Sequence, residues 1–319
     1  MKPQPTVSSR SRSPSTRHRI SGRAAACVAI AALAFAPALS AQAAGLKVYI
    51  SADMEGIAGV VTGSQLGPSG FEYGRFRGFM TAEVNAAIEA ARAMGATEIL
   101  VSDSHGNGEN LLVEELPGDI QLVRSWPRPL MMMEGIDATF DAVLLIGYHA
   151  STANPEGVRA HTFSSANLTA VRLNGVDMME ASMSAAIAGV FGVPVVMISG
   201  DDATVEEARM RIGDMEGAVT KWHYGFHSAR TLMPEAARGV IGERVRAALG
   251  RLDDFRPLRI DGPLELEISF KNYMPAELMA YLPNVDRVDS HTIRFVGRDM
   301  TEISRFIEFT TSYAANVTP

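Results

Sequence analysis

Four short apolar runs in this chain each lead into residues whose side chains bind metal ions. The runs are rich in Val, Ile and Leu, and helical periods separate them, which is typical of parallel strands with helices packed on the sheet. In such folds the carboxyl ends of the strands meet at one edge, where ligands bind. The four runs with the residues that follow them are Leu46–Ile50 before Asp53 and Glu55, Thr97–Val101 before Asp103 and His105, Asp141–Ile146 before His149, and Pro194–Ile198 before Asp201 and Asp202.

The order of these segments predicts an α/β fold in which a mostly parallel sheet has helices on both faces, a three-layer αβα arrangement. After Asp253 the pattern changes to an alternating strand at Leu264–Phe270 and a helix at Asp299–Tyr313. We therefore expect a catalytic α/β domain at 44–252 and a small α+β domain at 253–319. The helices expected in the first domain are Thr81–Met94, Met178–Phe191, Val205–Ile212 and Pro234–Leu249.

Residues 1–43 have the features of a secretory signal peptide. Six basic residues and no acidic one precede the apolar stretch Ala24–Leu39, and Ala41-Gln42-Ala43 is a typical cleavage pattern. A membrane anchor is the alternative, but the stretch is short, mostly Ala and interrupted by Pro37, so we expect no stable anchor. The mature protein is predicted to be periplasmic or secreted.

Removal of this leader makes the chain strongly acidic. The formal net charge is −7, and without the six basic residues of the leader 23 basic residues oppose 36 acidic ones, a net charge of −13. Such a charge disfavours nucleic acid as a partner. The only cysteine, Cys27, lies in the leader, so any metal ligands of the mature chain must be His, Asp or Glu.

The acids and imidazoles at the strand ends suit a metal centre. Asp53 and Glu55 point the same way in extended backbone, and two close carboxylates repel unless protons or cations bridge them. Together with His105 and His149 they suit Zn²⁺, and also Mn²⁺, Co²⁺ or Ni²⁺. From these residues alone, His161 is a further ligand, a general acid or a loop residue.

Other motifs narrow the chemistry. The chain has no G-x-S-x-G elbow, no Walker motif and no G-x-G-x-x-G after a strand, which disfavours serine hydrolases, P-loop enzymes and dinucleotide oxidoreductases. An H-E-x-x-H motif is also absent, so His223 and His227 are interpreted as packing or partner-contact residues. Asp201-Asp202 is expected to cap the following helix, and Glu180 has an alternative role as an acid at a helix N-terminus.

The ordered set of motifs resembles the zinc-dependent D-aminopeptidases of the DppA type, peptidase family M55. The resemblance implies two zinc ions per chain, held by Asp53, Glu55, His105, His149 and Glu180, with His161 as a catalytic residue. It further implies a ring-shaped homo-oligomer, a decamer in the type member, and short peptide substrates with an N-terminal D-residue, such as D-Ala-D-Ala. The motifs that carry the resemblance are Ser51-Ala52-Asp53-Met54-Glu55-Gly56, Asp103-Ser104-His105, Gly147-Tyr148-His149-Ala150, His161, Glu180, Ser199-Gly200-Asp201-Asp202 and Lys271-Asn272-Tyr273.

Five ligands suffice for two metals only if one of them bridges, and we expect Asp53 to do so because it sits deepest at its strand end. In the expected mechanism the two metals activate a water, and His161 stabilises the oxyanion or protonates the leaving amine. Two alternatives remain open from the sequence. One is a two-metal phosphoesterase, for which Arg159 or Lys221 would hold the phosphate. The other is a non-catalytic periplasmic protein that binds peptides or metal, although such binders usually have two lobes of similar size.

Overall fold

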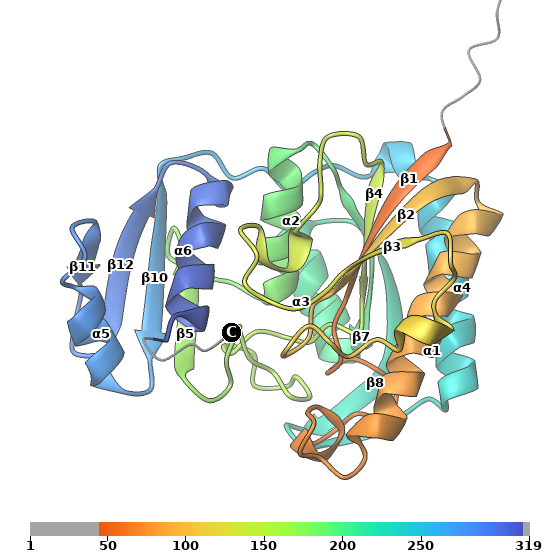
Figure 1. Ribbon diagram of the computed structural model, residues 1–319, viewed down its shortest axis with the longest axis horizontal. Coiled ribbons are helices and arrows are strands. Elements are labelled where there is room, and N and C mark those ends of the chain that lie inside the picture. Colours follow the sequence, from red (N-terminus) through yellow and green to blue (C-terminus); the bar gives the residue numbers. More distant parts are fainter. Residues whose placement is uncertain (1–44, 315–319) are drawn as a thin grey trace, which may run out of the picture. The chain divides into compact units, whose positions relative to one another are not determined.

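The structure is a computed structural model that describes residues 45–314. Its larger sheet has seven strands, and β1 (Leu46–Ala52) is an interior strand of this sheet. The seven strands have the order β3-β2-β1-β4-β7-β8-β9, and all neighbouring pairs are parallel except β8 with β9 (Figure 1). The predicted signal peptide, residues 1–43, lies outside the described residues. The other strands of this sheet are β2 (Ala96–Asp103), β3 (Gln121–Val123), β4 (Ala142–Ile146), β7 (Val195–Asp201), β8 (Glu216–Gly225) and β9 (Ser228–Thr231).

Helices cover both faces of this sheet, as the sequence predicted. Alternate residues of β1 point to opposite faces, so Val48 and Ile50 pack in one core with α1 and α4, whereas Tyr49 packs in the other with α2 and α3. The expected three-layer α/β class is therefore confirmed (Figure 1). The helices are α1 (Tyr73–Ala93), α2 (Glu180–Val190), α3 (Asp202–Ile212) and α4 (Pro234–Leu249).

A second, antiparallel sheet has the order β11-β12-β10-β5-β6. The segment 253–319, expected to be a small α+β domain, supplies β10, β11 and β12, whereas β5 and β6 precede α2, so the sheet is built from both sides of the predicted boundary. Asn174 and Gly175 have positive φ in the β5–β6 turn, as a tight hairpin requires. The elements of this part are β5 (Leu168–Leu173), β6 (Val176–Asp177), β10 (Leu264–Phe270), α5 (Tyr273–Met279), β11 (Val285–Arg287), β12 (Thr292–Gly297) and α6 (Met300–Ser312).

Three local features differ from the sequence expectation. The helix expected at Thr81 begins already at Tyr73, because the buried side chains of Tyr73 and Phe76 extend its apolar face. The segment 216–231 forms the β8–β9 hairpin, which the sequence pattern does not predict. Helix α3 begins at Asp202, since the side chain of Asp201 accepts a bond from the Thr204 amide and caps the helix. Among the described helices, none is long and apolar enough to span a bilayer.

Candidate metal centre

The sheet order brings three strand ends together. Asp53 and Glu55 follow β1, His105 follows β2 and His149 follows β4, and these strands are immediate neighbours in the order β2-β1-β4. The register aligns Ala52 with the last residue of each neighbouring strand. The order of the sheet reverses at β1, with β2 and β3 on one side and β4 and β7 on the other, and such a switch point is the usual ligand site of an open α/β sheet.

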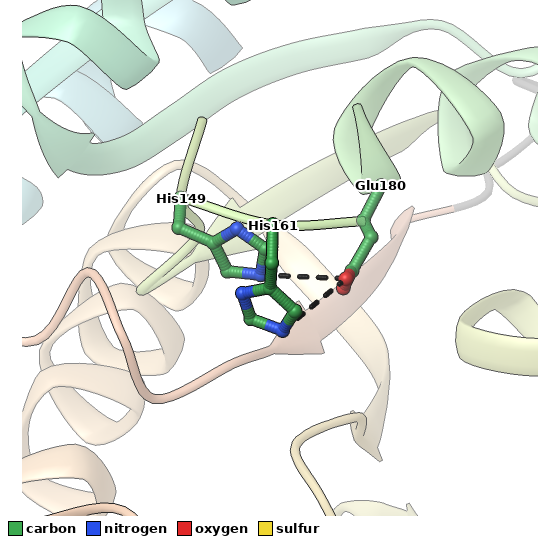
Figure 2. Close-up of side chains that lie close together, drawn as sticks. All are labelled: His149, His161 and Glu180. Atoms are coloured by element: carbon green, nitrogen blue, oxygen red, sulfur yellow. Dashed lines mark ion pairs between the residues drawn. The ribbon is translucent and has the colours of Figure 1, made fainter. Parts of the chain in front are cut away.

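Two further predicted residues complete the cluster. Glu180 is the first residue of α2, and His161 lies in the loop that leads from β4 towards β5. The rings of His149 and His161 are stacked with centroids 4.0 Å apart. Both rings direct Nε2 at the Glu180 carboxylate, at 3.4 Å from His149 and 3.8 Å from His161 (Figure 2). The structure therefore brings all six predicted site residues together.

Asp53 lies at the centre of this group. Its Oδ1 is 3.1 Å from His105 Nδ1, and its Oδ2 is 3.3 Å from His149 Nε2. His105 Nδ1 is also 3.0 Å from Glu55 Oε2. Two sets of three residues have ligand atoms close enough to share one ion, namely Asp53 with Glu55 and His149, and His149 with His161 and Glu180.

Backbone carbonyls orient the three imidazoles. His105 Nε2 lies 2.7 Å from the Leu66 oxygen, His149 Nδ1 lies 3.0 Å from the Ala150 oxygen, and His161 Nδ1 lies 2.8 Å from the Arg159 oxygen. A nitrogen beside a carbonyl oxygen must carry a proton to make this bond. The opposite nitrogen of each ring, which faces the carboxylates, can then offer its lone pair to a metal. Such outer contacts are typical of histidine ligands.

Several atoms of the cluster are buried without a hydrogen-bond partner. These are Asp53 Oδ2, Glu55 Oε2 and His149 Nε2, in side chains that are almost fully buried. Buried polar atoms are rarely left without a partner, because the cost is about 1–3 kcal/mol each. Because one ligand atom of each of these three residues lies within 4.8 Å of the others, a cation between them could bind all three, and the residues present fit a bound metal ion.

The electrostatics of the cluster also favour bound positive charge. Burial alone would lower the pKa of His105, but the carboxylates of Glu55 and Asp53 outweigh it and hold this pKa well above its usual value. At His149 burial also acts to lower the pKa, but the carboxylates of Glu180 and Asp53 outweigh it and raise this pKa well above its usual value. At Asp53, burial and the charge of Glu55 raise the pKa. The cluster therefore attracts protons or metal cations.

A cavity of about 230 Å³ opens beside the cluster. Among the described residues, its lining includes no Lys or Arg, so acidic groups dominate its charge. The sequence did not indicate its apolar wall or Glu308, because these residues come from distant loops and from α6 and belong to no motif. Besides the cluster, the lining residues are Ser104, Gly106, Trp126, Met131, Met132, Phe163, Glu308, Thr311 and Ser312.

The remaining polar candidates have structural contacts outside the cavity. Asp201 caps α3 and also accepts the Val158 amide at 2.6 Å, which fixes the loop before His161. His223 lies on β8 and is paired with Asp202 at 2.9 Å. Neither His223 nor His227 lines the cavity.

Comparison with known proteins agrees with this geometry. A family model described as D-aminopeptidase, peptidase M55, matches residues 46–309. The D-aminopeptidase of Bacillus subtilis (strain 168) is 34% identical over 261 residues, which cover 81% of this chain and 93% of that protein.

A solved structure is also similar to this chain over most of its length. It is described as the Zn-dependent D-aminopeptidase DppA from Bacillus subtilis, a self-compartmentalizing protease. It has a TM-score of 0.81 and 32% sequence identity, with 86% of this chain and 99% of that chain covered. The resemblance identified from the motifs is therefore confirmed, and the chain belongs to the peptidase M55 family of D-aminopeptidases.

Proposed function

We propose that this protein is a zinc aminopeptidase that binds two zinc ions per chain and removes the N-terminal D-residue from short peptides such as D-Ala-D-Ala. The observation that carries the proposal is the set of buried, unpartnered ligand atoms on Asp53, Glu55 and His149. Zinc is favoured because imidazole and carboxylate are its usual ligands in catalytic sites, and the similar Bacillus subtilis structure is described as Zn-dependent.

The two carboxylate oxygens of Asp53 face different ligands, and this arrangement supports two bound ions rather than one. Its Oδ1 faces His105 and its Oδ2 faces His149, so one carboxylate reaches both sides of the cluster. Glu55 would complete the first set together with His105, and Glu180 the second set together with His149. Asp53 would accordingly contribute one carboxylate oxygen to each set.

Zinc bound here would polarise the scissile carbonyl and lower the pKa of a bound water towards neutrality. His161 is placed to handle a proton beside that reaction. Its Nδ1 is committed to the Arg159 carbonyl, while its Nε2 faces Glu180 and the cavity. We therefore assign His161 to stabilising the oxyanion or protonating the leaving amine, in agreement with the role expected from the resemblance.

The charge of the cavity supports a substrate with a cationic end. An aminopeptidase must admit a free ammonium group, and Glu308 on α6 adds a further carboxylate to the lining. A phosphoesterase would use Arg or Lys side chains to hold the phosphate of its substrate. The two candidates for this role, Lys221 and Arg159, do not line the cavity. Lys221 is buried under hydrogen bonds to carbonyl oxygens, and Arg159 is not among the lining residues. The structure thus favours the peptidase over the phosphoesterase.

Assembly and location form part of the same proposal. We propose a ring-shaped homo-oligomer, a decamer, that is exported after cleavage of residues 1–43. The description of the Bacillus subtilis protein as self-compartmentalizing supports an assembly. Exposed large apolar side chains on and after α5, among them Tyr273, Leu278 and Tyr281, provide surface for such contacts. Light scattering coupled to size-exclusion chromatography measures the number of chains directly.

The decisive experiment compares hydrolysis of D-Ala-D-Ala, L-Ala-L-Ala and a phosphomonoester by the purified protein, with metal content measured on the same sample. Cleavage of the D-peptide alone by protein that holds about two zinc ions per chain is the expected result. Cleavage of the phosphomonoester alone would replace the peptidase by the phosphoesterase. Zinc-loaded protein that cleaves none of the three compounds would support a binding protein instead.

A further inference from the structure

Lys221 of β8 is almost completely buried, and the hydrogen bonds of its ammonium group all go to one short loop. We infer that Lys221 is a positioning residue for Glu55, because its ammonium group holds the backbone conformation from which the Glu55 carboxylate reaches the metal centre. This inference rests on the proposed zinc site. We call residues 55–60, which follow β1, the Glu55 loop.

Three carbonyl oxygens of the Glu55 loop converge on Lys221 Nζ. The oxygen of Glu55 itself accepts one hydrogen bond, the oxygen of Ile57 accepts a second at 3.1 Å, and that of Val60 a third at 2.7 Å. A protonated lysine has three donors, and this arrangement uses all of them.

The contact with Glu55 acts on the peptide group that directly follows this ligand. Lys221 binds the carbonyl oxygen of that peptide, and the amide nitrogen of the same peptide, on Gly56, donates to the Gly147 oxygen at 2.7 Å. Gly147 lies two residues before His149. The peptide after Glu55 is therefore held at both ends, between β8 and the strand end that carries His149, and the two ligands are fixed relative to each other.

Neighbouring side chains hold the rest of the Glu55 loop. Thr220 donates to the Gly56 oxygen at 2.7 Å, Glu83 accepts the Ala58 amide at 3.0 Å, and Thr231 accepts the Gly59 amide at 2.8 Å. The loop thus lacks regular structure, but side chains from α1, β8 and β9 bind its polar groups. Of these three side chains and Lys221, it is Lys221 that contacts Glu55.

An apolar residue of the same size would not replace Lys221. Methionine in its place would fill the space but would leave three carbonyl oxygens without their donor, which favours a changed loop conformation or entry of water. Both changes would move Glu55. Residues that orient metal ligands typically alter metal affinity by about 10–100-fold when replaced, and we expect an effect of this size.

The test is zinc affinity, measured by competition with a chromogenic chelator, in the native protein and in Lys221→Met. The visible spectrum of the Co²⁺-loaded protein is recorded in parallel, because it reports the geometry of the ligands rather than turnover. Thr231→Val is the matched control, since it removes one hydrogen bond from the same loop without touching Glu55. Lys221→Met should bind zinc about 10–100-fold more weakly with an altered spectrum, and Thr231→Val should resemble the native protein.

A double-mutant cycle shows whether Lys221 acts through Glu55. In a Glu55→Gln background, Lys221→Met should change zinc affinity by less than about threefold, because the ligand it positions is already impaired. An equally large loss in that background, or an equal loss in Thr231→Val, would overturn the inference. If the methionine variant does not fold, Lys221→Gln is measured by the same criteria.

Two failures are distinguishable in this design. Native protein that does not bind zinc would refute the proposed function itself. Native protein that binds zinc tightly, with Lys221→Met binding it equally tightly, would refute only the role of Lys221.

Discussion

Zinc binding should displace protons from His105 and His149. In the metal-free protein the neighbouring carboxylates outweigh burial and raise the pKa of both imidazoles well above the ordinary value. Near pH 6 both rings are therefore protonated, and each must lose its proton before it can bind a metal. Loading both zinc ions near this pH should release about two protons, so the combined binding free energy of the two ions should become more favourable by about 2.7 kcal/mol per pH unit, which is about tenfold in affinity for each ion.

The same shifts determine how the metal-free protein responds to pH. Because the folded pKa values of His105 and His149 lie above the unfolded value of about 6.5, their contribution to stability is fully present below about pH 6.5. It is lost as the pH rises through the raised folded values. Removal of zinc should therefore harm the protein more at alkaline than at mildly acidic pH.

Titration calorimetry in buffers of different ionisation enthalpy counts the protons released on zinc binding. His223→Ala is the control, since His223 neither lines the cavity nor belongs to the proposed ligands, and it should release the same number as the native protein. Release of fewer than about one proton by the native protein near pH 6, or an affinity that does not depend on pH, would refute this account of the site.

Two further predictions concern single residues. His161→Ala should retain its zinc and lose turnover by about 10²–10⁴-fold, whereas His149→Ala should lose zinc and turnover together. Measuring kcat and metal content on the same sample separates the two variants. Full turnover in His161→Ala would remove His161 from the mechanism. Gly56→Ala should destabilise the protein by about 2 kcal/mol or more in urea unfolding, because the Cβ of the alanine would overlap the carbonyl oxygen of Tyr148. An unchanged midpoint of urea unfolding would mean that the Glu55 loop adapts freely.

The local pattern of the sequence predicted the strands that carry the site well. An apolar run such as Asp141–Ile146 has a strong strand signal because it is buried on both faces, and β4 is observed at Ala142–Ile146. The β8–β9 hairpin was missed, because glycine and exposed polar residues interrupt its apolar pattern. Helix α1 was predicted too short, since its first turn is stabilised by burial of Tyr73 and Phe76 rather than by a local signal.

Residue types at the strand ends were enough to choose Asp53, Glu55, His105 and His149 as candidates, because parallel strands carry their carboxyl ends to one edge. Only the tertiary structure decided how these side chains meet. The tautomer of each imidazole depends on the carbonyl beside it, such as the Leu66 oxygen for His105, and no pattern along the chain encodes that contact.

The same limit applies to Lys221 and Glu308. The sequence identified Lys221 only as a possible phosphate contact, and the fold instead buries it under the Glu55 loop. Glu308 reaches the cavity because α6 packs near α2, although more than a hundred residues separate them along the chain. The sequence by itself determined most of the strands and helices and the candidate ligands at the strand ends, since these depend on neighbouring residues. The tertiary structure decided which distant groups surround them, because contacts between residues far apart in the chain arise only when the elements pack.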